Sequence, residues 1–226
     1  MPRNGVTGEL EQQIMLSAGC PGIILYGRRR VGKSTVLRNL DGFLPTTVRV
    51  AYLSAQSPDL FTSPTAFAGA IAKAVRSDAV ANDLPELFAV LTAENQRLTD
   101  AGKRLVLAID EYEMLDQKIG EGVFPVGMLD TLRESMQTHR AITWILAGSH
   151  QITELPHAAW TSYLVSARLI EVPVFTAAET RLLLTAPAKS STLWPKDSPL
   201  RPGFDPSFWG PDGIERIYAE KNKTWQ

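Results

Sequence analysis

Cysteine is nearly absent from this sequence, because Cys20 is the only one in 226 residues. One thiol cannot form an internal disulfide, so a reducing compartment is expected, and the thiol is interpreted as a small buried apolar group. Histidine is also scarce. His139, His150 and His157 are scattered along the chain, so no Cys/His spacing indicates a metal site.

The chain also lacks a strong net charge and a long apolar run. Its formal net charge is −1, which gives no overall field to attract nucleic acid or an anionic membrane. No stretch approaches the roughly 18 apolar residues of a membrane span, and residues 1–10 lack the apolar segment of a signal peptide. We therefore expect a soluble cytoplasmic protein, with no membrane partner and with nucleic acid not indicated.

The most informative motif is GRRRVGKS at residues 27–34. Its spacing is that of a phosphate-binding loop: Gly27, four residues, Gly32, Lys33 and Ser34. The glycines permit a turn that points backbone N–H groups inward as a nest for phosphate oxygens. Lys33 is predicted to contact the β- and γ-phosphates, and the Ser34 hydroxyl to bind Mg²⁺. The motif therefore predicts ATP and Mg²⁺ as ligands.

The sequence around this motif has the context that such a loop needs. Residues 22–26 form a short apolar run typical of a buried strand, and residues 33–40 have one apolar helical face. The positive end of that helix would face the phosphates. Inside the loop, three arginines could screen phosphate charge or contact a partner, although a solvated basic turn is an equally simple reading. The predicted nucleotide-binding set also includes Arg28, Arg29, Arg30 and Val31.

Two carboxylates follow a second apolar strand, at residues 104–109. Asp110 is predicted to hold the Mg²⁺ through water, and Glu111 to orient or deprotonate the attacking water. A polar loop after a strand is the alternative reading of the pair. Glu113 and Asp116 are expected on the solvated side of the chain. Ser149 follows a further strand, and it is predicted to sense the γ-phosphate if that strand lies beside the central one. An ordinary turn with a capping serine is the alternative reading of this position.

Strands alternate with helices along most of the chain, which predicts crossover units and a parallel sheet. An α/β fold with helices on both faces of the sheet follows from this alternation. The strands are expected at 22–26, 48–53, 104–109, 141–147 and 168–172. The helices are expected at 9–18, 33–40, from 62–64 onward, 83–101, 124–136, 177–185 and 214–221. Loops are expected at 54–58, around Gly120 and Gly122, and at 187–206.

Four segments together resemble the bacterial and archaeal AAA-like ATPases of the STAND group, the signal-transduction ATPases with numerous domains. They are GRRRVGKSTVL, LVLAIDEYEML, WILAGSH and LIEVPVFTAAETRLLLTAP. The resemblance implies a three-layer P-loop NTPase with a five-stranded parallel sheet, ATP with Mg²⁺, and a nucleotide-driven switch. By position it assigns Asp110 to the Mg²⁺, Glu111 to hydrolysis and Ser149 to the sensor. It assigns nucleotide contacts to Gly27, Gly32, Lys33, Ser34 and Thr35.

The resemblance also implies a helical lid after the core. We expect residues 1–187 to form the ATPase core and residues 188–226 to form a linker and a partial lid, with 214–221 as the opening helix of that lid. Such ATPases usually carry an upstream segment that helps to seat adenine, and here only a short, poorly matching N-terminus precedes the core.

The favoured function is slow, Mg²⁺-dependent ATP hydrolysis in which Glu111, Lys33 and Ser149 are catalytic. Hydrolysis would drive a switch that involves a protein partner or self-association. Two alternatives stay open. One is a small-molecule kinase on the same fold, against which the pair of carboxylates argues. The other is a non-catalytic module that binds nucleotide or a partner.

Overall fold

The structure is a computed structural model, and it describes residues 3–54, 60–185, 206–210 and 212–223. The chain divides into two compact units. One is Asn4–Val172, and the other combines Met1–Arg3 with Pro173–Gln226. The expected boundary between residues 187 and 188 lies outside the described residues, as do nearly all of the expected loops 187–206 and 54–58.

The unit Asn4–Val172 is built on one five-stranded parallel sheet with the order β2-β3-β4-β1-β5. This confirms the predicted α/β fold and all five predicted strands. Continuous apolar runs form the central strands, because both faces of a parallel sheet are covered by helices. The strands are β1 (Ile23–Tyr26), β2 (Val48–Ser54), β3 (Arg104–Asp110), β4 (Ile142–Gly148) and β5 (Arg168–Glu171).

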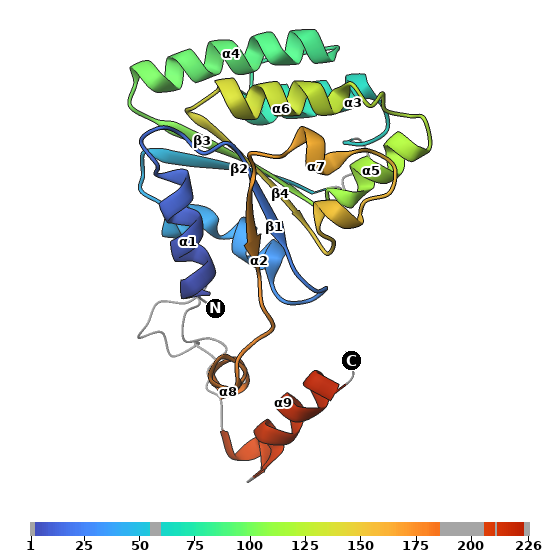
Figure 1. The fold of residues 1–226 in the computed structure, drawn as a ribbon. Helices are drawn as coiled ribbons and strands as arrows, with labels where there is room; N and C mark the ends of the chain where they lie inside the picture. Colours follow the sequence, from blue (N-terminus) through green and yellow to red (C-terminus); the bar gives the residue numbers. More distant parts are fainter. Residues whose placement is uncertain (1–2, 55–59, 186–205, 211, 224–226) are drawn as a thin grey trace. The chain divides into compact units, whose positions relative to one another are not determined.

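Helices cover both faces of this sheet, as Figure 1 shows. In β3, Leu105, Leu107 and Ile109 face one core, whereas Val106 and Ala108 face the other. This alternation follows from the two-residue period of a strand. The first core is covered by α3 (Pro64–Val75), α4 (Leu84–Asp100), α5 (Glu113–Gly120), α6 (Met128–Thr138) and α7 (Trp160–Tyr163). The second is covered by α1 (Asn4–Ile14) and α2 (Lys33–Arg38).

Several helix starts follow directly from the sequence. Ser63 caps α3 by accepting a hydrogen bond from the backbone N–H of Ala66 at 3.1 Å, with Pro64 in the first turn. Asp83 caps α4 by accepting from the N–H of Glu86 at 2.8 Å. Both starts match the predicted helices.

Other boundaries were predicted wrongly. The first helix is Asn4–Ile14 rather than 9–18, and the expected helix 33–40 gives way after Arg38 to the 3-10 turn η1 (Leu40–Phe43). Residues 113–120 form α5 where a loop was expected. The 3-10 turn η2 (Ile152–Glu154) and α7 were also not foreseen.

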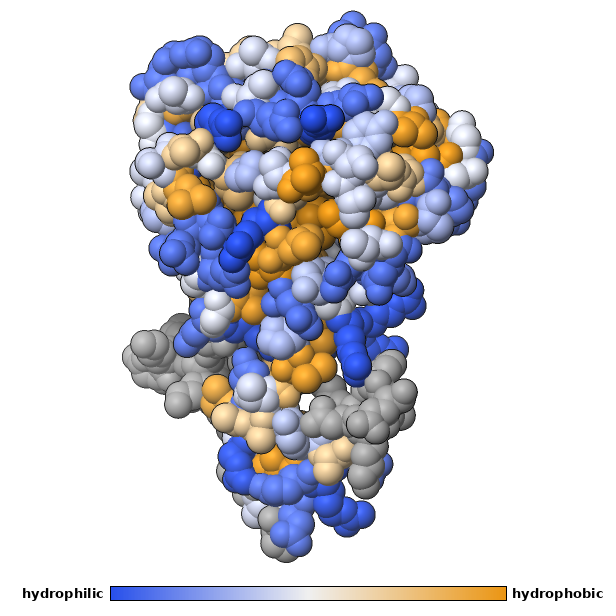
Figure 2. Space-filling model, in the orientation of Figure 1, coloured by the Kyte–Doolittle hydropathy of each residue, from blue (hydrophilic) through white to orange (hydrophobic). Residues whose placement is uncertain are grey.

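Strand β5 lies at the edge of the sheet, and most of its residues are exposed. Leu169 is exposed there, as is the nearby Val165, and Figure 2 shows apolar residues gathered around this strand. Single exposed apolar side chains are common on folded proteins. None of the helices in the described ranges combines the length and the apolar character that crossing a membrane requires.

The second unit contains α8 (Ala177–Thr185), the 3-10 turn η3 (Pro206–Trp209) and α9 (Gly213–Lys223). A capping box begins α8, because Thr176 N donates to Glu179 Oε2 at 2.8 Å and Glu179 N donates to Thr176 Oγ1 at 3.2 Å. The Arg3 guanidinium lies 3.9 Å from the centre of the Phe175 ring. The helices predicted at 177–185 and 214–221 are therefore present.

Candidate functional site

The turn between β1 and α2 has the backbone that its glycines predict. Gly27 has a φ of 149°, and Gly32, which caps α2, has a φ of 98°. Side chains are disfavoured at both angles. A Cβ atom on Gly27 would also collide with the carbonyl oxygen of Val172, just beyond β5. The loop therefore passes close to the neighbouring backbone, where only glycine fits.

The Lys33 ammonium is folded back onto its own loop. Its Nζ donates to the carbonyl oxygens of Gly27 at 2.6 Å and Arg28 at 2.8 Å, and the residue is buried. Burial lowers the pKa of Lys33, and the carboxylates of Glu113 and Asp110 oppose that shift. An anion that entered the loop could take over the hydrogen bonds now accepted by the two carbonyls.

Asp110 lies at the carboxyl end of β3, buried beside the neighbouring strand β2. The hydroxyl of Tyr52 donates to Asp110 Oδ2 at 2.9 Å, and the N–H of Glu111 donates to Oδ1 at 3.1 Å. The Arg38 guanidinium lies 5.2 Å from the centre of the Tyr52 ring. Sequence reasoning missed Tyr52. The sequence places the Tyr52 hydroxyl near the end of a predicted strand. It does not show that this strand pairs with the one that ends at Asp110.

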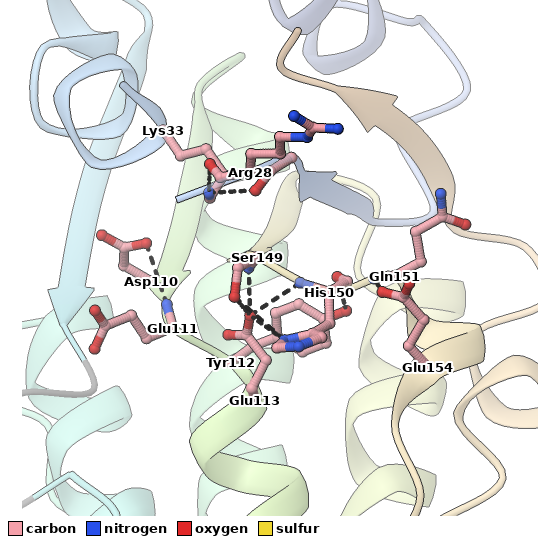
Figure 3. Close-up of polar contacts among 11 residues, drawn as sticks. Arg28, Lys33, Asp110, Glu111, Tyr112, Glu113, Ser149, His150, Gln151 and Glu154 are labelled. Carbon is pink, nitrogen blue, oxygen red and sulfur yellow. Dashed lines mark hydrogen bonds and ion pairs between the residues drawn. The ribbon is translucent and has the colours of Figure 1, made fainter. Parts of the chain in front are cut away.

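Glu111 turns the chain away from the strand. Its φ is 57°, in the left-handed region that side chains other than glycine rarely adopt. Figure 3 shows its side chain pointing to the left of the view, away from Ser149. The turn is followed by α5, whose first residue is Glu113.

Glu113 was expected to be solvated, and this was wrong. Its side chain is only 20% exposed and accepts hydrogen bonds from the end of β4. Ser149 N and Ser149 Oγ donate to Glu113 Oε1, the second at 2.9 Å, and His150 N donates to the same oxygen at 3.1 Å. Figure 3 shows the Glu113 carboxylate turned toward Ser149 and His150. The error arose because α5 was taken for a loop.

Asp116 is also not solvated. It is 2% exposed, and its Oδ1 accepts from Trp160 Nε1 at 2.7 Å and from His157 N at 3.2 Å. Because both donors come from α7 and the segment before it, Asp116 ties α5 to that part of the chain. Its role in the structure is to satisfy buried donors.

The ionisation of the cluster is governed by burial and hydrogen bonding. Burial raises the pKa of Glu113, but hydrogen bonds from its own backbone, Ser149 and His150 outweigh it and bring the pKa below its ordinary value. Burial strongly raises the pKa of the neighbouring Tyr112, whose hydroxyl donates to the carbonyl oxygen of His150 at 3.0 Å. Glu113 is therefore an anion and Tyr112 a neutral donor near pH 7.

Lys33, Asp110 and Glu113 line one cavity of about 450 Å³. The strand order brings these residues together, because β4 lies between β3 and β1. Ala147 pairs with Asp110, and Gly148 pairs with Tyr26. Of the residues singled out from the sequence, the cavity is lined by Arg29, Arg30, Lys33, Ser34, Asp110, Glu111 and Ser149. It is also lined by Glu113, Met114, Gly148 and His150.

The other predicted loop residues have different surroundings. Val31 is buried in the core that α1 and α2 cover, so its packing is structural. Arg28 and Thr35 are exposed, and the carbonyl oxygen of Arg28 is one of the two acceptors of Lys33.

The oxygen atoms of Ser34 and Asp110 are the kind of donors that Mg²⁺ prefers, and both residues line the cavity. Within the described ranges, no group of three or more His, Cys, Asp or Glu residues could hold a metal alone. A Mg²⁺ ion here would therefore need further oxygen ligands from phosphates or water, which suits a site that binds a metal together with a nucleotide.

The family model described as "AAA domain" matches residues 17–155 of this chain. That range includes the turn between β1 and α2, Asp110, Glu111 and Ser149. No curated protein matches the sequence.

Solved structures share the fold at low identity. The Aeropyrum pernix ORC2 protein, solved as ADPNP and ADP complexes, is 17% identical with a TM-score of 0.61, over 85% of this chain and 54% of that one. The A. pernix ORC1 protein in complex with DNA is 19% identical with a TM-score of 0.59, over 98% and 55%. A Walker-type ATPase of Pyrococcus abyssi is 16% identical with a TM-score of 0.58, over 81% and 56%.

This chain thus spans about half the length of the structures that it matches. At these identities the likeness establishes the fold. Because one of those proteins was solved with DNA, the small net charge of this chain is not a sufficient reason to set nucleic acid aside, and that expectation is not supported.

Proposed function

The chain belongs to the AAA domain family, and from that premise we propose that it binds ATP with Mg²⁺ and hydrolyses it slowly. The observation that carries the proposal is the shared cavity, in which Lys33 from one strand end meets Asp110 and Glu111 from another. An ammonium and a pair of carboxylates on one side of a parallel sheet fit a ligand that carries both phosphate and a divalent cation.

Each residue has a role that its position supports. The N–H groups of the 27–32 turn and the Lys33 ammonium would hold phosphate oxygens, and Lys33 would leave the carbonyls of Gly27 and Arg28 to do so. Ser34 and Asp110 would hold Mg²⁺, which when bound neutralises phosphate charge. Glu111 would orient the attacking water, and Ser149 would donate its hydroxyl toward the γ-phosphate.

We further propose that this chemistry drives a switch of the STAND type. Ser149 and His150 lie at the end of β4, so a change in their hydrogen bonds would alter the cavity wall when the γ-phosphate leaves. The exposed side chains of residues 28–30 lie at the same edge, where a protein partner or a second copy of this chain could contact them. We propose residues 188–226 as the linker and partial lid.

The decisive experiment measures ATP binding by the full chain and its Lys33→Ala variant in the presence of Mg²⁺. Losing a charge-assisted hydrogen bond of about 1.5–3 kcal/mol should weaken binding at least about tenfold. Lys73→Ala is the matched control, because Lys73 is an exposed lysine of α3, and it should bind like the wild type. Equal affinities for Lys33→Ala and the wild type would refute the site.

Hydrolysis needs a separate measurement. Phosphate release by the wild type without any added acceptor would distinguish an ATPase from a kinase, and Glu111→Gln should slow it. A chain that binds ATP but releases no phosphate would be a non-catalytic nucleotide-binding module.

A further inference from the structure

Glu113 is a partly buried anion that lines the cavity, and the proposed hydrolysis does not use it. Three donors that follow β4 converge on its Oε1: Ser149 N, Ser149 Oγ and His150 N. His150 Nδ1 lies 3.3 Å from the same oxygen. The N–H and O–H groups that follow β4 are therefore already hydrogen-bonded to this one carboxylate oxygen.

We propose that Glu113 is a specificity-determining residue which weakens binding of a nucleoside triphosphate relative to a diphosphate. It does so because its carboxylate holds the donors of Ser149 and His150 that a terminal phosphate would need. This inference rests on the proposed nucleotide site.

Sheet register places these donors beside the phosphate-binding turn. Tyr26 pairs with Gly148, so Ser149 follows β4 at the level where Gly27 follows β1. A phosphate chain that starts at the turn and extends toward Asp110 must pass the end of β4, since β4 lies between β1 and β3. Glu113 lines the same cavity as Lys33 and Ser149.

The position of Glu113 is held by its surroundings. It is the first residue of α5, where the helix dipole favours a negative charge. Its carboxylate packs against the backbone of β4, because a Cβ atom on Gly148 would lie 2.6 Å from Glu113 Cδ. Glycine at position 148 therefore leaves the space that the carboxylate fills.

Two consequences follow for a terminal phosphate. It would compete with Glu113 for the same N–H and O–H donors, and it would face a like charge in a partly buried cavity, where screening by water is weak. A diphosphate, whose last phosphorus lies nearer to Lys33 and the turn, would meet neither obstacle. Glu113 should thus lower triphosphate affinity and leave diphosphate affinity nearly unchanged.

Glu113→Gln is the informative variant, because glutamine keeps the size of the side chain and one acceptor oxygen but removes the charge. With Mg²⁺ present, the dissociation constants of ADP and of a non-hydrolysable ATP analogue are measured for the full chain. We expect triphosphate binding to tighten about 5- to 50-fold, which corresponds to roughly 1–2.3 kcal/mol, with ADP binding within about twofold of the wild type. Glu134→Gln, at an exposed position of α6, should change neither constant.

The outcomes separate the two proposals. The preference for the triphosphate is the ratio of its affinity to that of ADP. If this ratio is unchanged or lower in Glu113→Gln, the proposed role of Glu113 is wrong, although the nucleotide site stands as long as the wild type binds ADP. If the variant loses hydrolysis while that preference stays the same, Glu113 acts as a base and the inference also fails. A wild-type chain that binds neither nucleotide removes the proposed function itself.

A second test measures the wild-type chain and does not require Glu113→Gln to fold. His139, His150 and His157 are the only histidines, so a His150→Gln spectrum identifies the ring-proton resonance of His150 by NMR. The triphosphate analogue should shift that resonance by displacing the contact between His150 Nδ1 and Glu113, and ADP should leave it in place. A resonance that responds equally to both ligands contradicts the inference.

Discussion

The hydroxyl of Tyr52 fixes one oxygen of the Asp110 carboxylate, at 2.9 Å. In the Tyr52→Phe variant that oxygen loses its donor, so the carboxylate can rotate about its remaining contact with Glu111 N. Because Asp110 is the proposed Mg²⁺-side acid, we expect the Mg²⁺ concentration needed for half-maximal ATP binding to rise about 3- to 10-fold, as for the loss of one hydrogen bond of about 1 kcal/mol.

Titration of ATP binding with Mg²⁺ checks this expectation for Tyr52. Tyr163→Phe, at a partly buried position of α7, serves as the control and should leave the Mg²⁺ dependence unchanged. A Tyr52→Phe variant that loses ATP affinity at every Mg²⁺ concentration to the same extent would mean that Tyr52 supports the fold rather than the carboxylate.

At the scale of the structural element, the path of the 27–32 turn depends on the backbone just beyond β5. Replacing Gly27 by alanine would drive a Cβ atom into the carbonyl oxygen of Val172. We expect the free energy of unfolding to fall by about 1–3 kcal/mol, the usual cost of overpacking, and ATP binding to weaken because the nest is displaced.

Gly102→Ala is the matched control for this change in the turn. Gly102 also has a positive φ, of 61°, but a Cβ atom there meets nothing within 4 Å. Gly102→Ala should lower the free energy of unfolding by about 1 kcal/mol, the cost of the left-handed backbone alone. It should not change ATP binding. Urea unfolding of both variants gives the comparison. Equal losses would show that backbone conformation matters at Gly27 and the approach to Val172 does not.

The elements that could be predicted are those with a strong local signal. The run at 105–109 is apolar throughout, and Ser63 and Asp83 mark helix starts through their own side chains. Helix α5 was missed because it is short and has few apolar residues to mark a helical face. The environments of Glu113 and Tyr52 could not be deduced, because both depend on which strands are neighbours in the sheet, and local sequence does not encode that order.

At the scale of the whole molecule, every residue that lines the cavity lies in the unit Asn4–Val172. Three strand ends contribute to it, from β1, β3 and β4. The site therefore depends on the integrity of the sheet. Conditions that loosen packing on either face should affect nucleotide binding, even when they act far from the cavity.

One such condition is pH, through a buried histidine between α4 and α6. Trp144 Nε1 donates to Ser135 Oγ at 2.9 Å, and Ser135 Oγ lies 2.9 Å from His139 Nδ1. Thr92 Oγ1 lies 3.0 Å from His139 Nε2 and donates to a backbone carbonyl. A neutral ring with its hydrogen on Nε2 satisfies all of these groups, whereas a second hydrogen on Nδ1 would displace that of Ser135.

Burial lowers the pKa of His139 below its ordinary value of 6.5. The unfolded chain then binds more protons than the folded chain at pH values between the two pKa values, so the free energy of unfolding must fall as pH drops below about 6.5. It should fall by at most about 1.4 kcal/mol per pH unit. Carboxylates such as Glu113, whose pKa is lowered, lose their contribution only at more acidic pH.

Urea unfolding between pH 7.5 and 5.5 measures this slope for the wild type, His139→Gln and His157→Gln. The His139 variant should be less stable at pH 7.5, by about 1–3 kcal/mol for the unsatisfied buried partners, and its slope should be nearly flat. The control should keep the wild-type slope, because His157 is exposed. If the free energy of unfolding of His139→Gln still falls with pH as in the wild type, other groups cause the pH dependence. Protonation would then not loosen the packing between α4 and α6.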